Sequence, residues 1–284
     1  MNNIVYEYDV DGASLSTMKV GGKVKRLCHP ANEAEFIRAL KETKEPFLVL
    51  GNGSNVVFSS AGFEGTVILT TELKGIEDTE KGFICGVGQS LSVTAMHAAD
   101  RGFKGMEFAF GIPGTIGGAV YMNAGAYGGE IKDVLKSVTC VDKEGKVYVL
   151  SAVEARLSYR HSVFMETPLY ILKAEFVFEK GNTEEIKAKM ADNMARRRDK
   201  QPLDYPSCGS TFKRPAGHFA GTLIEGCGLK GFSVGGAQVS EKHAGFVINR
   251  GGATGDDVVS LINKVQQIVL EKTGVLLETE VKIV

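Results

Sequence analysis

The sequence predicts a mixed α and β protein with two lobes. A chain of 284 residues is long enough for two hydrophobic cores. Short apolar strands alternate with helical segments along it. The 35 glycines exceed the usual share of about 7% and gather at 51–65, 111–129 and 226–255. We expect the backbone to approach another group closely at these three places.

The overall composition narrows the classes of function. Hydrophobic residues make up 43% of the chain and charged residues 24%, which is typical of a soluble globular protein. A formal net charge of -1 gives no general attraction to nucleic acid or to an anionic membrane. No leader is recognised at the N-terminus, and no run approaches the roughly 20 apolar residues that span a bilayer. We therefore expect a cytoplasmic protein that binds neither nucleic acid nor a membrane. No protein partner is predicted.

The five cysteines are odd in number, widely spaced and never in a C-x-x-C pair. This pattern favours buried thiols over a disulfide framework or a zinc site. We expect no bound metal.

The first lobe is predicted from alternating elements up to about residue 180. An extended segment over 19–28 precedes a helix capped by Asn32, and an apolar strand over 46–50 runs into the first glycine segment. The remaining elements of this lobe are expected to be strands at 56–58, 67–69 and 83–87, a helix at 90–101, a hairpin at 136–150 and a strand at 169–178.

The second lobe is predicted to hold two clear helices and a terminal strand. Thr183 is expected to cap a helix that runs to about Lys200, where three arginines either face solvent or bind a ligand. Thr254 and Asp257 form a capping-box pattern before an amphipathic helix that ends at Gly274. Residues 275–284 alternate as a strand that carries Glu278 and Glu280 on one face.

The first glycine segment follows an apolar strand, as a dinucleotide-binding fingerprint would. It consists of Gly51, Asn52, Gly53, Ser54 and Asn55. A dinucleotide fingerprint would open a helix, whereas a β-branched strand follows here. The segment fits a structural turn and a phosphate cradle of main-chain N–H groups equally well.

The second glycine segment, Gly111–Gly129, is denser. Pro113 fixes a turn, and small residues around it allow the backbone to wrap a flat or charged ligand at contact distance. Tight packing between two elements is the alternative. Tyr121 and Tyr127 either shape such a pocket or pack against neighbours.

Six segments, taken in order, resemble one enzyme family. They are VLGNGSNVVFSSAGFEGTVI, GIPGTIGGAVYMNAGAYGGEI, LSYRHSVF, YPSCGSTFKRP, GTLIEGCGLKGFSVGGAQVSEKHAGFVIN and LLETEVKIV. From about Lys19 to the C-terminus the chain resembles the UDP-N-acetylenolpyruvoylglucosamine reductases, in the branch without an inserted tyrosine loop. The resemblance implies an α+β fold: a two-part FAD-binding domain of the p-cresol methylhydroxylase/vanillyl-alcohol oxidase type over 15–180, then a smaller α+β substrate-binding domain over 181–284.

The family's reaction is reduction of UDP-N-acetylglucosamine enolpyruvate to UDP-N-acetylmuramate in peptidoglycan precursor synthesis, with FAD as cofactor and NADPH as co-substrate. By this resemblance Arg160 stabilises the enolate, Ser210 donates the proton and Glu280 polarises or orients the substrate. Lys213 either supports the Ser210 alkoxide or binds a substrate phosphate. Cys208 is expected to be a small thiol lining the pocket.

Matching the family's motifs also implies two binding sets. The expected FAD-binding residues are Gly51, Asn52, Gly53, Ser54, Asn55, Gly111, Pro113, Gly114, Thr115, Gly117, Gly118, Asn123, Ala124, Gly125 and Ala126. The expected substrate-binding residues are Tyr159, Lys213, Gln238, His243 and Asn249.

Two other functions fit the same glycine segments. One is an FAD-dependent sugar or alcohol oxidase with the same type of flavin domain, which would need no serine proton donor. The other is a non-catalytic nucleotide-binding module, which would be colourless when purified.

Overall fold

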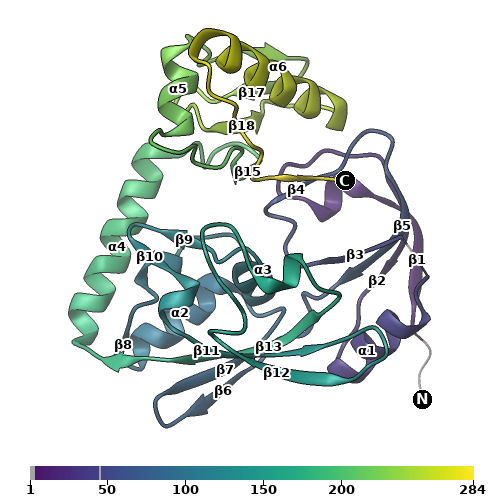
Figure 1. Ribbon diagram of the computed structural model, residues 1–284, viewed down its shortest axis with the longest axis vertical. Coiled ribbons are helices and arrows are strands. Elements are labelled where there is room, and N and C mark those ends of the chain that lie inside the picture. Colours follow the sequence, from purple (N-terminus) through teal and green to yellow (C-terminus); the bar gives the residue numbers. More distant parts are fainter. Residues whose placement is uncertain (1–3, 45) are drawn as a thin grey trace. The chain divides into compact units, whose positions relative to one another are not determined.

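The computed structural model describes residues 4–44 and 46–284, which form two compact units of interleaved segments (Figure 1). The first unit contains the chain up to Glu7 together with Leu27–Asn52 and Gly65–Arg196. The second contains Tyr8–Arg26, Gly53–Glu64 and Arg197–Val284. The predicted domain boundary near residue 180 stays a prediction, because compact packing units need not coincide with functional domains.

The first unit is built on a five-stranded sheet in the order β12-β11-β13-β7-β6, in which every neighbouring pair is antiparallel. Its strands are β6 (Ile76–Thr79), β7 (Gly82–Gly86), β11 (Leu135–Val141), β12 (Val147–Ser151) and β13 (Tyr170–Val177). The expected 136–150 hairpin is therefore confirmed as β11 and β12. Strand β3 (Phe47–Leu50) pairs in parallel with β5 (Phe63–Leu69), of which residues 65–69 belong to this unit, with Phe47 opposite Thr66. These two strands form one edge of a four-stranded sheet.

Helices and short strands complete this unit. The helices are α1 (Glu33–Glu42), α2 (Leu91–Asp100) and α3 (Ile116–Tyr121), with 3-10 turns at Glu107–Ala109, Ile131–Asp133 and Val163–Met165. The two-residue strand pairs are β8 (Phe103–Lys104) with β14 (Glu179–Lys180), and β9 (Gly125–Ala126) with β10 (Gly129–Glu130). The expected caps are present, since Asn32 Oδ1 accepts from Glu35 N and Ser90 Oγ accepts from Val93 N.

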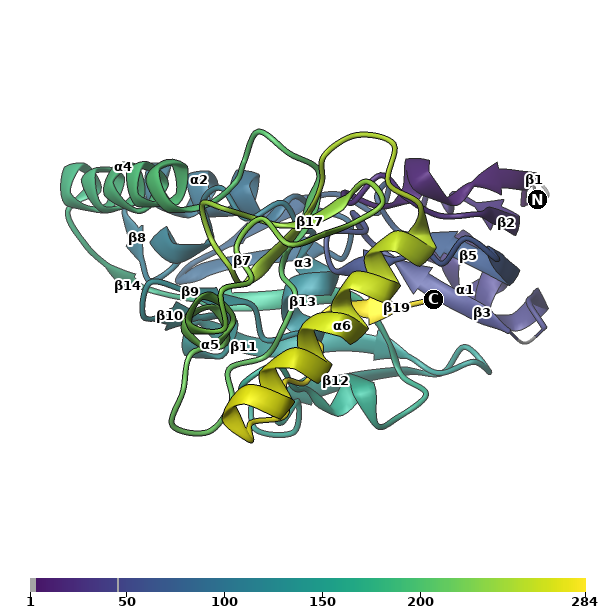
Figure 2. The same cartoon turned by 90° about the horizontal axis from the view of Figure 1, so that it is seen from above.

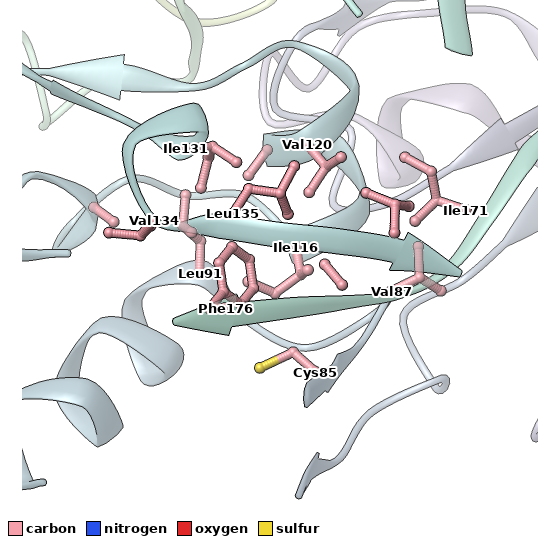
Figure 3. Packing of buried hydrophobic residues seen from close by; sticks show 14 of the residues in the cluster. Cys85, Val87, Leu91, Ile116, Val120, Ile131, Val134, Leu135, Ile171 and Phe176 are labelled. Carbon is pink, nitrogen blue, oxygen red and sulfur yellow. The ribbon is translucent and has the colours of Figure 1, made fainter. Parts of the chain in front are cut away.

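The core of the first unit lies between the five-stranded sheet, α2 and α3. Figure 3 shows Val87, Leu91, Ile116 and Phe176 packed together there. An aromatic cluster of Phe83, Phe103, Phe176 and Phe178 extends this core, with ring centroids 5.0–6.4 Å apart. Burial of these apolar and aromatic side chains is the main contribution to the stability of the unit.

The second unit packs one long helix on a four-stranded sheet. The sheet has the order β15-β18-β17-β16, formed by β15 (Ser207–Ser210), β16 (Ser233–Val234), β17 (Ala237–Val239) and β18 (Phe246–Asn249). Helix α6 (Gly255–Thr273) contacts β16, β17 and β18. Figure 2 shows α6 as the long yellow helix. The remaining elements include β4 (Val56–Val57), β19 (Lys282–Ile283), α5 (Ala220–Gly226) and a 3-10 turn at Gly12–Leu15. β1 (Tyr6–Asp11) and β2 (Lys23–Cys28) have residues in both units.

Helix α6 confirms the predicted capping box and the predicted amphipathic helix. Thr254 Oγ1 accepts from Asp257 N while Asp257 Oδ2 accepts from Thr254 N, and Gly274 ends the helix with φ 73°. Burial lines one face of the helix, where Val258, Leu261, Ile262, Val265 and Val269 are all fully covered.

Four expectations about elements need correction. Helix α4 (Thr183–Lys200) is capped by Asn182, not Thr183, because Asn182 Oδ1 accepts from the main-chain N–H of Glu184 at 2.9 Å. The strand expected over 19–28 begins only at Lys23, and Lys19 has a positive φ of 58°. The strand expected over 275–284 is only β19. The second glycine segment contains a helix, α3, that its composition did not suggest.

All five cysteines are free and buried, as expected. None of the helices in the described part of the chain is long and apolar enough to cross a membrane.

Candidate active site

The start of the first glycine segment lies against the second glycine segment within the first unit. Asn52 Nδ2 donates to Pro113 O at 3.1 Å. A Cβ at Gly51 would overlap Thr115 Oγ1, so any larger residue there would displace the side chain that caps α3. The two segments predicted to bind one cofactor are therefore adjacent at this point.

The second glycine segment is fixed to the sheet and to α2. Gly117 N donates to Val87 O at 2.8 Å, and Leu91 N donates to Gly114 O at 2.9 Å. Thr115 caps α3 by accepting from Gly118 N. Because Ile116 N also donates to Gln89 O, the first N–H groups of α3 hold the fold together and are not available to a phosphate.

Main-chain N–H groups of the first glycine segment remain for an anion. Asn52, Gly53 and Ser54 donate no main-chain hydrogen bond to any residue of 4–44 or 46–284. Successive N–H groups in a turn form an anion-binding concavity. These are the N–H groups that a phosphate cradle would use, and FAD binding by this segment stays a prediction.

Arg160 lies in a two-residue turn of the first unit. Ser158 and His161 exchange both main-chain hydrogen bonds, each 3.1 Å long, and leave Tyr159 and Arg160 at the tip. Arg160 has a φ of 53°, an unusual conformation for a residue with a side chain. Its guanidinium carbon lies 5.2 Å from the centroid of the Tyr159 ring.

An ionic cluster braces the base of this turn. His161 Nε2 lies 2.6 Å from Glu166 Oε1, and Arg156 donates to Glu166 Oε2 at 2.6 Å. These partners, His161 first, hold the pKa of Glu166 below its ordinary value. The loop that carries Arg160 is therefore closed by charge as well as by main-chain bonds.

Ser210 ends β15 in the second unit, and its strand is bulged. Ser207 pairs with Ile248 and Ser210 with Phe246, and Gly209 between them has a φ of 72°. The Ser210 side chain is half-buried, and its hydroxyl makes no hydrogen bond within the described residues. It is therefore available to a ligand.

Two side-chain hydrogen bonds, made by Thr17 and Cys208, attach strand β15 to other segments of the second unit. Thr17 Oγ1 donates to Ser207 O at 2.7 Å, and Cys208 Sγ donates to Val56 O at 3.1 Å. Burial raises the pKa of Cys208, so its sulfur stays a thiol and is unsuited to nucleophilic attack. Sequence reasoning missed Thr17, because no local pattern indicates a bond between residues 190 positions apart.

Glu280 runs beside the Ser210 segment. Glu280 N donates to Thr211 O at 2.8 Å, and Thr279 bridges to Phe212. Glu278 is exposed, and its carboxylate pairs with Lys213 Nζ at 3.2 Å. The chain thus separates the two glutamates that alternation alone could not distinguish: Glu278 has a cation at the surface, while Glu280 is half-buried.

Three of the residues predicted to bind substrate make hydrogen bonds to other residues of the second unit. Asn249 donates to Met18 O and Lys19 O and accepts from Gly251 N, and its side chain is buried. Gln238 donates to Gly231 O at 3.1 Å. His243 accepts from Gly245 N and packs edge-on against Phe246, and burial lowers its pKa.

Comparisons with known proteins show which family the chain resembles. Residues 24–151 match the model of an FAD binding domain, and residues 201–284 match that of the UDP-N-acetylenolpyruvoylglucosamine reductase C-terminal domain. The UDP-N-acetylenolpyruvoylglucosamine reductase of Caldanaerobacter subterraneus subsp. tengcongensis is 48% identical over 272 residues, 95% of this chain and 90% of that protein. The one from Lachnoclostridium phytofermentans is 50% identical over 256 residues, 88% of this chain and 83% of that protein.

A solved structure agrees over the whole chain. The crystal structure of UDP-N-acetylenolpyruvylglucosamine reductase from Thermus caldophilus is 32% identical, has a TM-score of 0.84 and covers 99% of this chain and 98% of its own. An FAD-binding domain followed by this C-terminal domain defines a flavin-dependent oxidoreductase of α+β fold. The chain belongs to the UDP-N-acetylenolpyruvoylglucosamine reductase family. The predicted fold class and FAD dependence are confirmed.

Proposed function

We propose that the protein reduces UDP-N-acetylglucosamine enolpyruvate to UDP-N-acetylmuramate with FAD and NADPH. The observation that carries this proposal is identity of 44–50% to curated reductases of this name over most of the chain. Arg160, Ser210 and Glu280 stand in the segments that carried the resemblance. FAD, held by the two glycine segments, would supply the hydride transfer between NADPH and the substrate alkene.

Arg160 is proposed to bind the substrate carboxylate. Hydride addition at the terminal alkene carbon moves negative charge into the conjugated carboxylate, where a fixed cation stabilises it. A guanidinium remains charged at every relevant pH and binds a carboxylate through two parallel bonds. The left-handed turn that presents Arg160 supports this role, because strained backbone gathers at functional sites.

Ser210 is proposed to donate the proton to the carbon that bears the ether oxygen. Its half-buried hydroxyl has no hydrogen-bond partner among the described residues, which is what a group reserved for substrate needs. Neighbouring Cys208 stays neutral and donates to Val56 O, so it does not compete for the proton transfer.

Glu280 is proposed to orient or polarise the substrate next to Ser210. Its main chain is bonded to Thr211, the residue that follows Ser210. Lys213 pairs with Glu278 at the surface, and it is proposed either to support the Ser210 alkoxide or to bind a substrate phosphate. We also propose that Tyr159, half exposed at the tip of the Arg160 turn, contacts substrate.

Other assignments are proposals of the same kind. Residues 15–180 are proposed as the FAD-binding domain and 181–284 as the substrate-binding domain. We propose that three residues contribute to substrate binding by holding the loops around it in place. They are Gln238, His243 and Asn249. We propose a cytoplasmic location, and no protein partner is proposed.

Steady-state assays with the purified protein test the function. We expect a yellow protein that oxidises NADPH only when UDP-N-acetylglucosamine enolpyruvate is added, with formation of one UDP-N-acetylmuramate per NADPH. Oxidation of a sugar or alcohol with reduction of oxygen would instead establish the oxidase. A colourless protein that binds nucleotides without turnover would establish a binding module.

A further inference from the structure

The turn that carries Arg160 is held at both ends by one segment of the second glycine region. Ser162 Oγ, just after the turn, donates to Tyr121 O at 2.7 Å. Asn123 Nδ2 donates to Ser158 O, just before the turn, at 3.0 Å. The donors are 0% and 1% exposed, so water does not compete for either bond.

The side-chain amide of Asn123 makes two further hydrogen bonds. It also donates to Glu130 Oε2 at 2.6 Å, and its Oδ1 accepts from Lys132 N at 3.0 Å. Asn123 has a φ of 43°, which asparagine tolerates better than most residues. The segment that ends α3 is therefore a rigid base, and the turn is attached to it at two points.

This attachment explains how Arg160 keeps an unfavourable backbone conformation. A left-handed residue persists only when its surroundings determine it. The two exchanged bonds between Ser158 and His161 close the turn, but they do not aim it. The bonds from Ser162 and Asn123 fix its direction relative to the glycine region.

We infer that Ser162, together with Asn123, positions the guanidinium of Arg160 for the substrate carboxylate. Ser162 touches no reacting atom and acts only through Arg160. This inference rests on the proposed function, and it adds a positioning residue that the motif comparison alone does not assign.

Ligand binding tests the inference without turnover. UDP-N-acetylmuramate carries the lactyl carboxylate, and UDP-N-acetylglucosamine lacks it. We expect Ser162→Ala to weaken binding of the first ligand by about tenfold, the effect of one misplaced charge-assisted bond, and to leave binding of the second unchanged. Ser162→Cys, which retains a weaker donor, should show a smaller loss.

Thr167→Val is the matched control. Thr167 Oγ1 donates to Val163 O at 2.9 Å, a bond of the same type in the same loop. Its removal should leave the preference for the carboxylate ligand intact. Thermal unfolding of each variant establishes that the ligands are compared on folded protein.

An Arg160→Lys background provides the second measurement. If Ser162 acts through Arg160, Ser162→Ala should cause little further loss once Arg160 is replaced. Equal weakening of both ligands, or a full additional loss in the Arg160→Lys background, would overturn the inference. A wild-type protein with no preference for the carboxylate ligand would instead contradict the proposed function, and the inference with it.

Discussion

Asn55 Nδ2 donates a hydrogen bond of 3.0 Å to Glu280 O, which joins the first glycine segment to the proposed catalytic glutamate. Lys282 N in turn donates to Asn55 O at 3.0 Å. One asparagine thus holds the chain on both sides of Val281. This arrangement places a residue of the predicted FAD set and a residue of the proposed catalytic set in the same small network.

Asn55→Ala is expected to lower both stability and turnover. Loss of the bond to Glu280 O should reduce the free energy of unfolding by about 1 kcal/mol and allow Glu280 to shift. Chemical denaturation and steady-state rates measure the two effects. A variant with wild-type turnover would show that Asn55 does not help to place Glu280.

Removal of residues 282–284 is expected to be far more damaging. It deletes β19, which pairs in parallel with β4, and with it the bonds from Val284 N to Val57 O and from Ser59 N to Val284 O. Several buried main-chain groups lose their partners, at about 1–3 kcal/mol each. Val284→Ala keeps these main-chain bonds and should remain near wild type when both are compared by thermal unfolding.

Gly117→Ala and Gly118→Ala form a matched pair in α3. A Cβ at Gly117 would lie 2.1 Å from Val87 Cγ2, whereas one at Gly118 would meet nothing closer than 3.7 Å. We expect Gly117→Ala to destabilise the protein by about 1–3 kcal/mol through overpacking. Gly118→Ala should be neutral or stabilising by up to about 1 kcal/mol, since alanine favours a helix.

The same pair has a direct check on its cause. Adding Val87→Ala should recover part of the stability lost in Gly117→Ala, as measured by denaturation of the FAD-free protein. Equal stability of the two single variants would contradict the close packing of α3 against Val87.

The capping box of α6 predicts a pH-dependent stability. Hydrogen bonds from Thr254 hold the pKa of Asp257 below its ordinary value, so the carboxylate stabilises the fold above the unfolded pKa of about 3.9. That contribution is lost as pH falls through the lower folded pKa. The stability difference between wild type and Asp257→Asn should therefore shrink below about pH 4, and a difference independent of pH would argue against the ionised cap.

Elements with strong local patterns could be predicted from the sequence. Asn32, Ser90 and the Thr254–Asp257 pair signal helix starts because a cap is a contact between residues three positions apart. Helix α3 escaped prediction because its glycines oppose helix formation, and it is held by bonds to Gln89 and Val87 that no local pattern shows. The terminal strand was overestimated because residues 275–281 alternate without a continuous partner strand.

The candidate site follows the same division. Motifs identified Arg160, Ser210 and Glu280, but not the residues that hold them. The side chains of Thr17, Ser162 and Asn55 donate hydrogen bonds to main-chain oxygens that lie 40 or more positions away in sequence. Such contacts depend on the completed fold, so the sequence alone does not reveal them.

The most direct test follows the reduced enzyme under anaerobic conditions. Wild type and Ser210→Ala are reduced with NADPH, mixed with UDP-N-acetylglucosamine enolpyruvate, and followed by the return of flavin absorbance. The proposed function predicts rapid reoxidation with formation of UDP-N-acetylmuramate in wild type, and slowing of at least about a hundredfold in Ser210→Ala with normal reduction by NADPH. Failure of the substrate to reoxidise the wild-type flavin would contradict the proposed function, and an unimpaired Ser210→Ala would contradict the proton donor.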